Sequence, residues 1–219
     1  MQVTKLPVIC QNTTNNTFYY KLKKALVFGW LGVVLIAIAC LFWYNDYVYS
    51  LPTPVPTGYI KVNIGQHVKL SNALIPEKGQ PVLLHFFNPD CPCSRFNIKH
   101  FKSLVATYGK RANFVVVLMN DSKYTAEQVK TKFELNVPVI NDVSLATACG
   151  VYSTPQAAIV DAEGKLYYRG NYNTTRYCTN TKTEFARIAL DALLSHQTAI
   201  NFNRLAVTAY GCSLPQCTK

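Results

Sequence analysis

The sequence predicts an α/β domain that follows an N-terminal transmembrane helix. Three observations lead to this prediction: an uncharged run at residues 25–44, short apolar runs at 82–87 and 114–119, and helix-like segments between and after those runs. Alternation of strand-like and helix-like segments is typical of layered α/β proteins. The chain of 219 residues is long enough for one such domain with additional segments at both ends.

The uncharged run at 25–44 is predicted to be a transmembrane helix, because about twenty apolar residues cross the hydrocarbon core of a bilayer. Basic residues favour the cytoplasmic side of such a helix. The run directly follows three lysines, Lys21, Lys23 and Lys24. We therefore expect residues 1–24 to be a short cytoplasmic N-terminus. The alternatives are a signal peptide cleaved after the small residues Ala37 and Ala39, or a lipoprotein-type junction at Cys40.

The segment after the helix is expected to be a linker. Residues 45–58 contain a Leu-Pro-Thr-Pro-Val-Pro pattern, which favours a semi-rigid, extended spacer. The α/β domain is then expected at 59–197, and a tail that contains Cys212 and Cys217 follows at 198–219. We expect at least one of these two cysteines to be oxidised and to tie the tail to the domain.

Composition excludes some classes of protein. With 49% hydrophobic and 15% charged residues the chain has the composition of a folded protein. Lysine and arginine outnumber acidic residues 22 to 11. The excess is spread along the chain without a basic cluster or a nucleic-acid-binding motif, so we expect no nucleic-acid partner.

The segments after residue 59 are expected to fold in the order βαβα followed by ββα. Short apolar or alternating runs indicate strands at 82–87, 114–119, 156–160 and 165–169, and a short pairing segment at 139–140. Helical spacing and capping signals indicate helices at 91–108, at 126–134 after a Thr125/Gln128 capping box, at 144–149 before Gly150, and from a Thr181/Glu184 capping box to Ser195.

The turn after the first strand, Asn-Pro-Asp-Cys-Pro-Cys at 88–93, is the strongest chemical signal. Cys91 is expected at the N-terminus of a helix, where backbone N–H groups and the helix dipole stabilise a reactive thiolate. A disulfide between Cys91 and Cys93 is awkward, because residues two apart on a helix point to different sides. The alternative partners are Cys178, Cys212 and Cys217. Cys149 is expected to be a buried apolar residue.

Two segments resemble the thioredoxin superfamily. Residues 85–95, His-Phe-Phe-Asn-Pro-Asp-Cys-Pro-Cys-Ser-Arg, resemble the strand-turn-helix that carries a Cys-x-x-Cys pair in membrane-anchored TlpA-like and ResA-like thiol/disulfide proteins. Residues 150–157, Gly-Val-Tyr-Ser-Thr-Pro-Gln-Ala, are similar to the segment that carries the cis-proline of that superfamily. The resemblance covers residues 60–195. It implies a thioredoxin-like fold, here with an N-terminal transmembrane helix and an extra C-terminal tail.

The resemblance also implies a function. It implies a bacterial inner-membrane protein with a periplasmic domain that exchanges thiols and disulfides with protein partners and needs no cofactor. Cys91 is expected to be the attacking thiol, Cys93 its partner, and Pro155, if cis, part of the docking edge. One departure is clear: a single residue separates Cys91 from Cys93, and Ser94 stands where the second family cysteine would be, so the chain represents a divergent Cys-Pro-Cys branch.

Three other functions stay open from the sequence. A Cys-x-Cys pair suits Cu(I), and SCO-type copper proteins share the fold, although they use Cys-x-x-x-Cys and a distant histidine. The histidines available for such a site are His67, His85, His100 and His196. A peroxidase would need a threonine two residues before its cysteine, which is absent here. The third alternative is a binding module without catalytic activity, in which disulfides only stabilise the domain.

Overall fold

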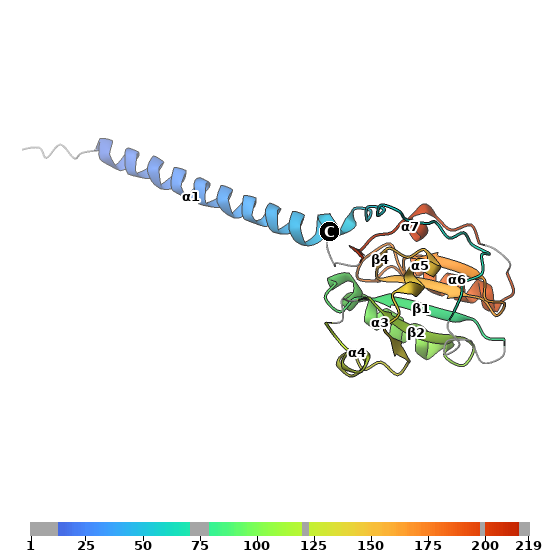
Figure 1. Ribbon diagram of the computed structural model, residues 1–219. Helices are drawn as coiled ribbons and strands as arrows, with labels where there is room; N and C mark the ends of the chain where they lie inside the picture. Colours follow the sequence, from blue (N-terminus) through green and yellow to red (C-terminus); the bar gives the residue numbers. More distant parts are fainter. Residues whose placement is uncertain (1–12, 71–78, 120–122, 198–199, 215–219) are drawn as a thin grey trace, which may run out of the picture. The chain divides into compact units, whose positions relative to one another are not determined.

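The computed structural model describes residues 13–70, 79–119, 123–197 and 200–214 (Figure 1). The chain divides into two compact units, Met1–Tyr47 and Val48–Lys219. The first unit contains helix α1 (Thr13–Phe42) and the π-helix η1 (Trp43–Tyr47). The second contains the α/β domain and the tail.

The first unit agrees with the predicted transmembrane helix. Within the described residues, one helix is long and apolar enough to cross a membrane, Thr17–Ser50, and it includes the predicted span 25–44. Its large apolar side chains are exposed. The expected N-terminal segment 1–24 is already helical from Thr13, and its residues 1–12 lie outside the described part of the chain.

A five-stranded sheet in the order β3-β2-β1-β5-β6 forms the centre of the second unit. Its strands are β1 (Val82–Phe87), β2 (Asn113–Leu118), β3 (Val139–Ile140), β5 (Gln156–Val160) and β6 (Leu166–Gly170). The central strand β1 pairs parallel with β2 and antiparallel with β5. All six residues of β1 are buried, as its continuous apolar sequence predicts for a strand covered on both faces.

Helices cover both faces of the sheet. On one face, α3 (Pro92–Tyr108) and α6 (Phe185–Leu194) pack on side chains such as Leu83 and Phe114. On the other face, α5 (Ser144–Cys149) packs on side chains such as Leu84 and Val117. The alternating side chains of each strand therefore belong to two separate apolar clusters, which hold the sheet as the middle layer.

Most predicted element boundaries are confirmed to within two residues. The Thr125/Gln128 capping box forms and opens α4 (Ala126–Lys132), and Gly150, with φ +67°, ends α5. The capping box at Thr181/Glu184 was wrong. Asn180 instead caps the short 3-10 helix η3 (Thr181–Thr183), and α6 begins only at Phe185, because the backbone of Glu184, with φ −74° and ψ 70°, is not helical. The Glu184 side chain binds Arg187 instead of capping the helix.

The segment 45–58 differs from the predicted spacer. Its first residues are helical, in η1 and then in α2 (Val48–Ser50). Thr53 is 3% exposed, and its backbone N–H donates to the Ala209 carbonyl oxygen at 2.8 Å. Its hydroxyl donates to the Gly211 carbonyl oxygen at 3.1 Å. This segment is held against the tail by hydrogen bonds that the proline pattern does not reveal.

The tail is part of the folded unit through its last described residue, Leu214. It contains the short helix α7 (Arg204–Val207) and the strand β7 (Cys212–Ser213). The Asn171 side chain, just after β6, donates to the carbonyl oxygens of Leu205 and Thr208 at 2.8 and 2.6 Å. The folded unit therefore begins before residue 59 and continues past residue 197, the limits expected for the domain.

Candidate functional site

Cys91 lies between the end of β1 and the start of α3. Asn88 orders this turn: its side-chain oxygen accepts from the Asp90 N–H at 2.9 Å, and its carbonyl oxygen accepts from the Cys91 N–H at 3.1 Å. Cys91 is the N-cap residue of α3, in an extended conformation, and Pro92 is the first helical residue. This places the Cys91 side chain at the end of the helix where backbone N–H groups have no helical partner, as predicted.

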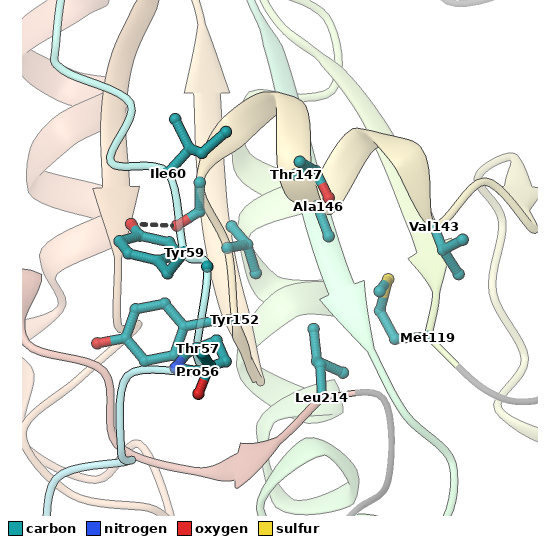
Figure 2. A pocket seen from close by; sticks show the side chains of 13 residues that line it. Pro56, Thr57, Tyr59, Ile60, Met119, Val143, Ala146, Thr147, Tyr152 and Leu214 are labelled. Atoms are coloured by element: carbon teal, nitrogen blue, oxygen red, sulfur yellow. Dashed lines mark hydrogen bonds between the residues drawn. The ribbon is translucent and has the colours of Figure 1, made fainter.

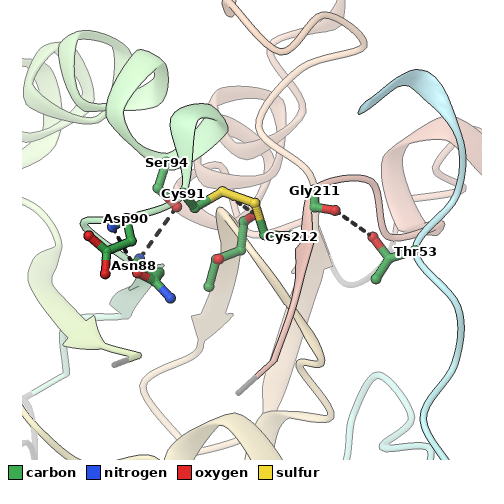
Figure 3. The surroundings of a disulfide bond; sticks show 8 residues. Thr53, Asn88, Asp90, Cys91, Ser94, Gly211 and Cys212 are labelled. Atoms are coloured by element: carbon green, nitrogen blue, oxygen red, sulfur yellow. Dashed lines mark hydrogen bonds between the residues drawn. A yellow bond between two sulfur atoms is a disulfide. The ribbon is translucent and has the colours of Figure 1, made fainter. Parts of the chain in front are cut away.

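Cys91 forms a disulfide with Cys212 of the tail (Figure 3). The two Cα atoms are 6.2 Å apart, although 121 residues separate them in the sequence. Both side chains are buried, at 0% and 1% exposure. The disulfide confirms that the tail is tied to the domain through one of its cysteines. Cys217 lies outside the described residues.

The expected pairing of Cys91 with Cys93 does not occur in this structure. Cys93 is buried in the same small cluster as Cys91 and Cys212, but the Cys91 sulfur bonds to Cys212 and not to Cys93. The observed pairing agrees with the reason that made the Cys91–Cys93 pair awkward in the sequence: Cys91 is the N-cap of α3 and Cys93 lies in its first turn, and residues two apart on a helix point to different sides. Cys212 was one of three alternative partners that the sequence allowed.

Pro155 lies beside the disulfide, as predicted. The Thr154–Pro155 peptide bond is cis, and the Thr154 carbonyl oxygen is 3.4 Å from the Cys91 sulfur. The register of the sheet brings them together, because Phe86 near the end of β1 pairs with Gln156 at the start of antiparallel β5. The three predicted site residues Cys91, Cys93 and Pro155 therefore lie in one region.

Asp90 is the acidic residue next to Cys91, and its charge is compensated. The Lys123 ammonium group donates to one carboxylate oxygen at 2.9 Å, and the Tyr124 hydroxyl donates to the other at 3.0 Å. The hydrogen bond from Lys123, followed by that from Tyr124, lowers the pKa of Asp90. The carboxylate therefore has its own partners and opposes a thiolate at Cys91 less than a lone acid would.

Two other cysteines of the domain are poor nucleophiles. Burial raises the pKa of the Cys149 thiol to about 12. Burial also raises the pKa of the Cys178 thiol to about 11, although the Asn97 side-chain amide donates to its sulfur at 3.0 Å. Because the thiolate is the reactive form, both residues are expected to react slowly. Cys149 is thus the buried apolar residue that its sequence context predicts.

His85, in β1, belongs to a buried polar cluster with Tyr172 and His100. Its Nδ1 atom lies 2.8 Å from the Tyr172 hydroxyl, and its ring stacks on Phe101 with centroids 4.4 Å apart. Complete burial, followed by the nearby His100, lowers the pKa of His85 to about 3. Among the residues that the structure describes, no three His, Cys, Asp or Glu side chains are grouped so that they could hold a metal ion. The arrangement does not favour the SCO-like copper site.

A pocket of about 440 Å³ lies next to the tail strand (Figure 2). Its walls come from residues 56–60, α5, Tyr152 and Met119, and Leu214 of the tail closes one side. Most of these side chains are apolar. Sequence reasoning found Cys91, Cys93 and Pro155 but not Thr53, Gly211 or Leu214, because no local motif marks a residue whose role depends on a neighbour far along the chain.

We expect His85 to make stability depend on pH. Its folded pKa of about 3 lies below the ordinary 6.5, so the unfolded chain binds an additional proton between these values, and stability falls as pH falls below 6.5. Replacement His85→Phe should reduce the slope of unfolding free energy against pH by about 1.4 kcal/mol per pH unit between these pKa values. Urea unfolding at several pH values measures it. An unchanged slope in His85→Phe would show that another group carries the pH dependence.

We expect a peptide map without reducing agent to recover Cys91 and Cys212 in one cross-linked pair. Cys149 and Cys178 should be alkylated slowly in the native protein and rapidly after unfolding, because burial suppresses their thiolate forms. Mass spectrometry of protein alkylated before and after denaturation measures both. A peptide that links Cys91 to Cys93 would contradict the pairing described above.

The sequence and the fold were compared with known proteins. The family model described as "Domain of unknown function (DUF6436)" matches residues 62–215. No curated protein matches the sequence. Among solved structures, a hypothetical protein from Sinorhizobium meliloti 1021 is similar with a TM-score of 0.58 at 20% identity, covering 71% of this chain and 96% of that chain.

Two further structures are similar in fold. An uncharacterized conserved protein from Geobacillus kaustophilus has a TM-score of 0.59 at 20% identity, covering 75% of this chain and 98% of that chain. A candidate thiol:disulfide interchange protein, DsbE, from Chlorobium tepidum has a TM-score of 0.50 at 18% identity, covering 61% of this chain and 99% of that chain. The fold is therefore thioredoxin-like, and the chain belongs to the DUF6436 family.

Proposed function

We propose that this chain is a membrane-anchored thiol-disulfide exchange protein in which Cys91 reacts with cysteines of a protein partner. The observation that carries the proposal is the Cys91–Cys212 disulfide at the N-terminus of α3, beside Thr154–Pro155. The fold shared with a candidate thiol:disulfide interchange protein supports it. We place the chain near the TlpA-like and ResA-like proteins, as a branch with its own cysteine arrangement.

The helix N-terminus supplies the chemistry that exchange requires. In the reduced protein, the unpaired N–H groups and the positive dipole end of α3 stabilise a thiolate at Cys91. Cys91 is therefore the attacking thiol, and Pro155 shapes the edge at which a partner docks. The Cys91–Cys212 bond supports Cys212, instead of Cys93, as the resolving thiol of this proposal.

The reaction is a reversible exchange with a partner that carries two cysteines. A partner thiolate attacks the Cys91 sulfur, the Cys91–Cys212 bond breaks, and Cys212 leaves as a thiolate. The second partner thiolate then attacks the partner sulfur of this mixed disulfide, and Cys91 leaves as a thiolate. The partner gains a disulfide, and Cys91 and Cys212 together gain two electrons. The reverse sequence reduces a partner disulfide.

The proposed location is the inner membrane of a bacterium, with residues 25–44 as a single span and the α/β domain in the periplasm. Lys21, Lys23 and Lys24 before the span favour an inside N-terminus. A disulfide is stable in an oxidising compartment and is rare in the cytoplasm. These two observations support the same orientation independently.

Substitutions at the three cysteines should separate their roles. In Cys212→Ser, Cys91 can attack a partner disulfide but has no resolving thiol, so disulfide-linked complexes with partner proteins should accumulate. Cys91→Ala should abolish them, and Cys93→Ala is the matched control that should leave their amount near that of the unmodified chain. Electrophoresis without reducing agent, with the full chain in its own membrane, measures the complexes.

Two outcomes would contradict the proposal. If Cys212→Ser accumulates no complexes, and the Cys91–Cys212 bond of the unmodified chain resists dithiols until the protein unfolds, the disulfide is only structural. If complexes accumulate in Cys93→Ala instead, Cys93 resolves the mixed disulfide and the role assigned to Cys212 is wrong.

A reporter that is active only in an oxidising compartment should be active when fused after Lys219 and inactive when fused before Met1. The charge flank and the single span predict this orientation. Activity of the two fusions in cells measures the orientation. The opposite pattern would place the α/β domain and its disulfide in the cytoplasm, and it would contradict thiol-disulfide exchange outside the cytoplasm.

A further inference from the structure

The tail pairs with the short strand that directly precedes Pro155 and lies beside Cys91. Strand β7 pairs antiparallel with β4 (Ser153–Thr154), so that Cys212 lies opposite Thr154. The Leu214 N–H continues the pairing by donating to the Tyr152 carbonyl oxygen at 3.2 Å. Cys212 therefore reaches the Cys91 sulfur as part of an extended strand on β4.

The other side of this strand is held by the segment that follows the N-terminal helix. Pro52 forms a bridge with Tyr210, and Thr53 donates to the carbonyl oxygens of Ala209 and Gly211. The tail thus lies between β4 and residues 52–53, and Figure 3 shows Thr53 and Cys212 on opposite sides of Gly211. Because Cys91 is fully buried in this arrangement, a cysteine of another protein can reach it only after a segment that covers it moves, and the tail strand is one such segment.

Gly211 is the residue that permits this close approach. Its φ of +147° lies in a region that L-residues other than glycine rarely adopt. A Cβ atom at this position would overlap the Thr154 carbonyl oxygen and lie 3.0 Å from the Thr154 carbonyl carbon. The edge therefore accepts an extended segment with glycine directly before its cysteine and excludes one with a larger residue there.

We propose that residues 209–214 are an intramolecular stand-in for the partner, which binds the same β4 edge through an extended segment with a Gly-Cys pair. This inference rests on the proposed function and names its substrate class. The tail competes with the partner for one edge, and its attachment to the same chain gives it a high effective concentration. A partner must displace the tail while its sulfur replaces that of Cys212.

The first test presents the tail sequence as a separate peptide. The protein is the full-length Cys212→Ser variant, reduced and in detergent, and the probe is the peptide Ala-Tyr-Gly-Cys-Ser-Leu with its cysteine linked to thionitrobenzoate. The Cys91 thiolate attacks the peptide sulfur and releases thionitrobenzoate, whose colour gives the rate. The matched peptide Ala-Tyr-Ala-Cys-Ser-Leu should react about tenfold more slowly, because its additional methyl group cannot fit.

The second test adds the same methyl group to the tail. Gly211→Ala in the Cys212→Ser background weakens tail binding, so the glycine peptide should react several-fold faster. Gly65→Ala is the matched control: Gly65 also has a positive φ, +86°, but no atom lies near its added Cβ, and the rate should not change. Thr53→Val, which removes the hydroxyl donor to Gly211, is a second variant expected to increase the rate.

The same methyl group should therefore have opposite effects in the peptide and in the tail. Equal rates for the two peptides, together with no effect of Gly211→Ala or Thr53→Val, would overturn the inference while Cys91 remains an exchanging thiol. If neither peptide reacts with the native variant, although both react with it after denaturation, the proposed function fails together with the inference.

Discussion

The burial of β1 on both faces is the constraint on which the site depends. All six of its residues are buried, and they pair with β2 on one side and β5 on the other. Because β5 runs antiparallel, its start lies beside the end of β1. The turn that carries Cys91 and the peptide bond before Pro155 therefore lie at the same end of the sheet. Moving either strand by one residue would turn its side chains to the opposite face and separate the two.

The disulfide then joins this end of the sheet to the C-terminal part of the chain. A cross-link between residues 121 positions apart removes chain entropy from the unfolded state, by about 5 kcal/mol in the simplest model. Hydrogen bonds from Thr53 and Asn171 hold the tail as well. The tail therefore has two kinds of support, and exchange at Cys91 would remove only the covalent one.

The buried His85 shows how burial lowers the pKa of a basic side chain. His85 is fully buried, stacks on Phe101 and has one polar contact, with Tyr172, through its Nδ1 atom. Desolvation disfavours its charged form, so the pKa is low and the ring is neutral at physiological pH. A neutral ring next to apolar side chains adds no charge near Cys91. The N-terminus of α3 is the feature beside Cys91 that stabilises a thiolate there.

The sequence by itself determined the strand and helix order, the apolar N-terminal helix, the position of Cys91 at a helix start and the region of Pro155. The first three follow from local patterns, namely apolar runs and capping residues, and the region of Pro155 follows from the resemblance of residues 150–157 to the thioredoxin superfamily. Only the tertiary structure decided that Cys91 bonds to Cys212, that Thr53 holds the tail and that Gly211 passes close to Thr154. Six cysteines after the helix allow fifteen pairings, and spacing along the chain cannot rank contacts made across 121 residues, because sheet register and packing decide which atoms meet.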